Sequence, residues 1–65
     1  MKISIEPLYT KYNVPALIAE TSIMDNWLVD NIGEMGNGWH WEDSETSFII
    51  DSDEDAIAFR LRFRL

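Results

Sequence analysis

The sequence has no cysteine and little glycine, proline or basic charge, and each shortage excludes a class of protein. Without cysteine, the 65-residue chain can form neither a disulfide framework nor a thiolate zinc site, the usual supports of a very small domain. The chain has only three glycines and two prolines, and 46% of its residues are hydrophobic. This composition is typical of a folded chain and not of a disordered one. Five lysines and arginines against twelve acidic residues give a net charge of −7, which argues against binding nucleic acid by neutralising its phosphates.

Long apolar runs are also missing. Residues 1–10 contain no apolar stretch of signal-peptide length, and the apolar stretch around Pro15–Ala19 is far shorter than the roughly 20 residues that span a bilayer. These absences predict a cytoplasmic protein without a membrane partner. The length predicts a single domain over residues 1–65, which would bury only about 60% of the surface that its unfolded chain exposes.

Alternation of apolar and polar residues predicts strands in both halves of the chain. The first strand covers residues 2–6, where isoleucine alternates with polar side chains, and Pro7 would end it. Residues 39–42 also alternate, and residues 46–51 carry an apolar run. The three residues Asp43–Glu45 between them predict a hairpin.

Helix-limiting residues predict two helices. Asn13 can cap the first helix, Gly33 can end it, and Ser52 or Asp53 can cap the second. The start of the first helix is left open, near Val14 or near Ser22, because the apolar run after Pro15 could equally be a strand. Its apolar stripe comprises Val14, Leu17, Met24, Leu28 and Ile32, widened by Ile23 and Trp27.

The last six residues decide the predicted architecture. In a helix, Arg60 and Arg64 would point into the arc between Ala56 and Ile57, which is otherwise expected to be the buried face. In a strand, the apolar and basic side chains separate completely onto Phe59, Leu61, Phe63 and Leu65 and onto Arg60, Arg62 and Arg64. We therefore predict a helix over residues 53–59 followed by a strand over residues 60–65. The order β-α-β-β-α-β predicts an α+β, ferredoxin-like fold, a four-stranded antiparallel sheet with two helices on one face.

The Trp39-His40-Trp41 cluster has two interpretations. Both tryptophans would share one face of a strand and His40 would take the other, so they could form an aromatic ligand platform or simply fill the core. One histidine, no cysteine and no nucleophile motif give no catalytic residue. His40 with Glu42 would give only two metal ligands. We predict no enzyme, no metal and no cofactor.

Charge is divided sharply along the chain. Residues 1–59 hold all twelve acidic residues and two lysines, a net charge of −10, whereas residues 60–65 carry +3. On a final strand the arginines would line the open face of the sheet. The candidate binding surface comprises Trp39, His40, Trp41, Arg60, Arg62 and Arg64.

The C-terminal third resembles small proteins of unassigned function from tailed phages of marine bacteria. The resemblance is carried by Phe48-Ile49-Ile50-Asp51, Glu54-Asp55-Ala56 and Phe59-Arg60-Leu61-Arg62-Phe63, with phenylalanine where such proteins often end in tryptophan. It implies a source and a fold, with the host-cell cytoplasm as location, and it supplies no catalytic residue.

Two functions follow as hypotheses. The first is a non-enzymatic module that binds a host protein or associates with itself as a homo-oligomer, burying apolar area that the monomer cannot bury. The alternative is linked to nucleic acid, either through RNA binding by the arginine strand or through imitation of DNA by the acidic surface. The net charge argues against nucleic acid as a direct partner.

Overall fold

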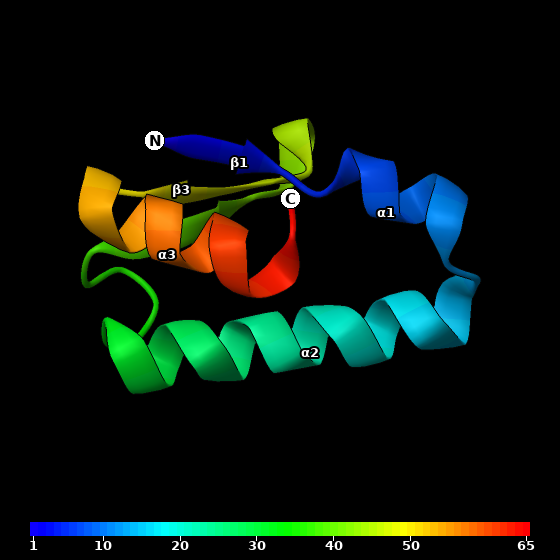
Figure 1. Ribbon diagram of the computed structural model, residues 1–65, viewed down its shortest axis with the longest axis horizontal. Coiled ribbons are helices and arrows are strands. Elements are labelled where there is room, and N and C mark those ends of the chain that lie inside the picture. Colours follow the sequence, from blue (N-terminus) through cyan, green and yellow to red (C-terminus); the bar gives the residue numbers. More distant parts are fainter.

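The computed structural model describes residues 1–65 and contains three helices and three strands, shown in Figure 1. The elements are β1 (Lys2–Ser4), α1 (Glu6–Lys11), α2 (Val14–Asn31), β2 (Trp39–Glu42), a 3₁₀ turn η1 (Asp43–Glu45), β3 (Ser47–Ile50) and α3 (Asp53–Phe63). The predicted α+β class is therefore right. The four-stranded ferredoxin-like sheet is wrong because the chain ends in a helix instead of a fourth strand.

The sheet is antiparallel, with β3 between β1 and β2. The register places Ile3 opposite Phe48 and Phe48 opposite Trp41, so these side chains share the face that the helices cover. The next row, Lys2, Ile49 and His40, points to the opposite face, which no helix covers. The predicted hairpin is confirmed, with Thr46 in the left-handed conformation after η1.

Helix α2 begins at Val14, which settles the choice that the sequence left open. The Asn13 side chain accepts a hydrogen bond from the Ala16 amide at 3.0 Å, as an N-cap should. Gly33, at a φ of +148°, follows the helix, and its amide bonds to the Leu28 carbonyl at 3.1 Å. Both predicted limits are confirmed, although Val14 itself is 68% exposed and does not belong to the core.

Helix α3 replaces the predicted final strand. It begins after the Ser52 cap, whose side chain accepts from the Asp55 amide, and it continues to Phe63. The prediction failed because it placed the buried arc between Ala56 and Ile57. The buried stripe instead runs through Ala56, Phe59 and Phe63, spaced three and four residues apart, and Ile57 is 51% exposed.

Six of the eight aromatic rings form one connected cluster beneath the helices. Phe48 lies at its centre, with ring centroids 4.9 Å from Trp41 and 5.4 Å from Phe59. From α2, Trp27 meets Phe59 at 5.7 Å and Phe63 at 6.2 Å. These edge-to-face contacts tie α2, α3 and the sheet together.

Helix α1 is absent from the sequence-based prediction. Pro7, which we interpreted as the end of a strand, lies in the first turn of α1, where its missing N–H leaves no bond unmade. Leu8 is the buried residue of this short helix and anchors it to the core.

Candidate functional site

The six residues of the predicted binding surface do not come together. Trp39 is 2% exposed, and its indole N–H donates to the Gly33 carbonyl, so it is a core residue. Trp41 shares that helix-covered face and is half-buried, whereas His40 lies exposed on the opposite face of the sheet. The predicted division of the cluster between two faces is confirmed.

The arginines lie at the C-terminal end of α3 and not on the sheet. All three are exposed, and the Arg62 guanidinium stacks over the Phe63 ring at 5.0 Å. They therefore face solvent on a helix, while the open face of the sheet displays Lys2, Ser4, His40, Glu42 and Ile49. No aromatic side chain lies on that open face.

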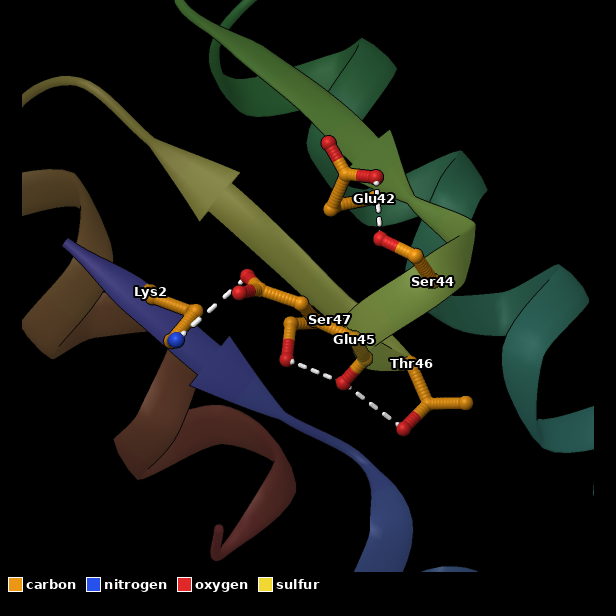
Figure 2. Close-up of polar contacts among 6 residues, drawn as sticks. All are labelled: Lys2, Glu42, Ser44, Glu45, Thr46 and Ser47. Atoms are coloured by element: carbon orange, nitrogen blue, oxygen red, sulfur yellow. Dashed lines mark hydrogen bonds and ion pairs between the residues drawn. The ribbon is translucent and has the colours of Figure 1, made fainter.

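The acidic hairpin turn is occupied with local contacts, which Figure 2 shows. The Glu45 carboxylate pairs with the Lys2 ammonium at 3.3 Å. The backbone carbonyl of Glu45 accepts a hydrogen bond from the Ser47 hydroxyl at 2.8 Å. The Ser44 hydroxyl donates to the Glu42 carboxylate at 2.9 Å. These contacts hold the turn in place and join it to β1.

A cavity of about 360 Å³ opens between α1, α2 and the β2 side of the sheet, and it was not foreseen from the sequence. Its floor is made of the core residues Ile5 and Phe48. Around the floor stand Tyr9 from α1, Ile18, Thr21 and Asp25 from α2, Met35 from the loop before β2, and Trp41 from β2. We call this site the groove.

The local structure of each element brings these side chains together. Ile18, Thr21 and Asp25 are three and four residues apart, so they form one row along α2. The loop that carries Met35 returns the chain to the sheet through Gly36 and Gly38, whose φ angles of +97° and +92° suit glycine.

The groove is apolar, with a carboxylate at its edge. Burial raises the pKa of the Asp25 carboxyl above the ordinary value of an aspartate. No cation lies within 4 Å of this carboxylate, because the one ion pair of the protein joins Lys2 to Glu45. The Thr21 hydroxyl is directed at the Leu17 and Ile18 carbonyls at 3.0 Å, so it does not donate into the groove.

This arrangement can bind an apolar group that carries a positive charge. The cavity provides apolar contact area, and Asp25 provides one acceptor. Because the Asp25 carboxylate is partly desolvated, a cation beside it would stabilise its ionised form. One sign of the groove can be seen in the sequence: Ile18, Thr21 and Asp25 have helical spacing and lie beside the apolar stripe of the helix. The partners Tyr9 and Met35 could not be inferred without the fold.

The wider molecule adds little to this site. No three histidine, aspartate or glutamate side chains gather as a possible metal site, and no helix has the length and apolar character needed to cross a membrane. Comparison with family models, with curated proteins and with solved structures finds no significant match.

Proposed function

We propose that this protein is a small, non-enzymatic binding module that takes up an apolar, positively charged segment of another protein in its groove. The observation that carries the proposal is the gathering of exposed apolar side chains at one cavity. Tyr9 is 46% exposed, and Ile18 and Met35 are each 61% exposed, and all three line the groove. Apolar surface concentrated at a cavity is typical of a binding site.

Charge defines the partner more closely. The carboxylate of Asp25 has a raised pKa and no cation beside it, so an arginine or lysine from a partner would both pair with it and favour its ionised form. The surrounding chain is strongly acidic, which attracts a basic segment over longer distances. The resemblance to small phage proteins extends the proposal to a protein of the host cell as the partner.

The nucleic-acid alternative has weaker support. RNA reading on a sheet needs aromatic side chains on its open face, and here Trp39, Trp41 and Phe48 all point toward the helices. The arginines that were expected to line the sheet lie on α3. Imitation of DNA would have to use an acidic surface whose Glu42 and Glu45 already hold the hairpin turn.

The test uses a synthetic amphipathic peptide with leucine and arginine on one face, and a matched peptide in which glutamate replaces arginine. Binding is followed by the NMR shifts of the Ile18 and Met35 methyl groups, which line the groove. We expect the arginine peptide to shift both methyls and the glutamate peptide to shift neither. Equal shifts from both peptides, or none from either, would contradict the proposal.

Two variants locate the binding. Ile18→Arg places a cation in the groove and should abolish the shift of the Met35 methyl. Ile23→Arg makes the same change at a position of α2 that is 47% exposed and outside the groove, and it should leave binding unchanged. Loss of binding in both variants would show that general charge, and not the groove, attracts the peptide.

A further inference from the structure

A second unpartnered surface lies on the outer side of α3. Ile57 is 51% exposed and Leu61 is 75% exposed, and the two are four residues apart on one row of the helix. Arg60 lies beside Leu61, Arg64 follows the last turn of the helix, and a shallow hollow of about 290 Å³ lies among these residues. We call Ile57, Arg60, Leu61 and Arg64 the α3 patch.

No aspartate or glutamate side chain pairs with the arginines of the α3 patch. The protein has twelve acidic residues, yet its one ion pair joins Lys2 to Glu45. The only polar contact of an arginine side chain joins the Arg60 Nε to the Leu65 carbonyl at 3.4 Å. The patch is thus an apolar and basic surface on a molecule whose residues 1–59 carry a net charge of −10.

The groove has the complementary chemistry, because it is apolar and has the Asp25 carboxylate at its edge. The two surfaces lie on different sides of α2. Trp27 faces α3, and at 100° per residue Asp25 lies about 160° away from Trp27 around the helix. The α3 patch of one chain therefore does not face the groove of the same chain.

We propose that the α3 patch of one copy docks into the groove of a second copy, with Leu61 entering the cavity and an arginine facing Asp25. This inference rests on the proposed function, since it names the segment that the groove takes up. The two surfaces differ, so the contact is head-to-tail. One exposed leucine and one or two ion pairs make a weak contact whose population depends on protein concentration and falls with added salt.

The experiment uses two single variants that add the same charge. Ile18→Arg blocks the groove and leaves the patch intact, and Leu61→Arg removes the apolar side chain of the patch and leaves the groove intact. Both side chains are more than half exposed, so both variants should fold. Association is measured by sedimentation equilibrium over a range of concentrations at low and high salt.

We expect the mean mass of the wild type to rise with concentration and each variant alone to stay monomeric. An equimolar mixture of the two variants should form a one-to-one complex and stop there, since only one patch and one groove remain intact in the pair. Ile23→Arg, outside both surfaces, should associate like the wild type.

Three results would overturn the inference: a wild type that stays monomeric at every concentration, variants that associate as the wild type does, or a mixture that does not combine. The arginine peptide then separates this failure from failure of the proposed function. If it shifts the Met35 methyl in Leu61→Arg, the groove binds such segments and only the second copy is wrong. If it shifts nothing, the proposed function fails as well.

Discussion

The two sides of α2 are built differently. On one side, Trp27 packs edge-on against Phe59 and Phe63 of α3, in a continuous aromatic cluster. On the other side, Ile18 and Asp25 border a cavity, and Ile18 remains mostly exposed. The same helix thus provides a tightly packed face and an open one.

This difference between the two sides of α2 indicates where a very small domain obtains its stability. A chain of this length has a total free energy of unfolding of about 3–10 kcal/mol, and one fully buried aromatic side chain accounts for about 3–5 kcal/mol when it is truncated. The aromatic side therefore supplies a large share of the free energy that holds the fold. The exposed apolar side chains on the groove side, such as Ile18 and Met35, contribute little to folding and remain available for binding.

The largest expected effect is that of Phe59→Ala. Phe59 is fully buried and contacts the rings of Trp27, Phe48 and Phe63, so we expect a loss of about 3–5 kcal/mol and a largely unfolded chain. Urea unfolding followed by circular dichroism measures it, and Phe59→Leu gives a smaller, measurable loss if the alanine variant does not fold. Ile18→Ala, on the open side, should change stability by less than about 0.5 kcal/mol. Similar losses for the two alanine variants would break the comparison.

An intermediate effect is expected from Asn13→Ala, which removes the cap of α2 at the groove end. The loss should be about 1 kcal/mol, with faster amide exchange in the first turn of α2 and a shifted Ile18 methyl. Ser52→Ala removes the same kind of cap from α3 and is the control. It should cost a similar amount without moving the Ile18 methyl, and a shift of that methyl in both variants would refute the separation.

A smaller effect, dependent on pH, is expected from Asp25→Asn. Burial raises the pKa of Asp25 in the folded state, so the ionised carboxylate destabilises the fold above that pKa, and the cost disappears once the carboxyl is protonated. The asparagine variant should therefore be slightly more stable than the wild type at pH 7. The difference should shrink as the pH falls and vanish below the unfolded pKa of about 3.9.

Asp30→Asn is the control, because it removes one negative charge from another exposed position of the same helix, outside the groove. Its effect on the urea midpoint measures the general benefit of lowering the net charge. An Asp25→Asn curve that matches the Asp30→Asn curve at every pH would leave the groove carboxylate without a special role.

The smallest effect is expected from Met35→Ala. Met35 is 61% exposed in the loop before β2, so its truncation should change the free energy of unfolding by less than about 0.5 kcal/mol. The same variant should weaken binding of the arginine peptide, because the groove loses part of its wall. A substantial loss of stability would show that the groove side also supports the fold.

The sequence predicts those features of the structure that depend on residues close together in the chain. The cap at Asn13, the stop at Gly33 and the hairpin follow from short-range backbone chemistry and were predicted correctly, and Ser52 was one of the two predicted caps of α3. The division of the tryptophans and His40 between two faces follows from strand geometry alone.

The sequence did not predict the elements whose conformation is determined by tertiary packing. Residues 60–63 alternate as a strand would, which favoured the wrong prediction, and the pairing of Phe59 and Phe63 with Trp27 selects the helix. Helix α1 is too short to show a helical period in its apolar residues. Its buried residue, Leu8, is buried only through contact with the core formed by other elements. The groove joins residues from α1, α2, a loop and the sheet, so no local pattern encodes it.

The strand order also has a consequence for the path of folding. β1 pairs only with β3, so the first strand finds its partner more than forty residues further along the chain. The β2–β3 hairpin closes a short loop and can form in microseconds, whereas β1 must wait for a much longer closure. Until then α2 can pack only on the two-stranded hairpin, so its helical form depends more on the Asn13 cap and on the Gly33 stop. The end residues of this helix thus act early in folding, before its buried side chains join the complete core.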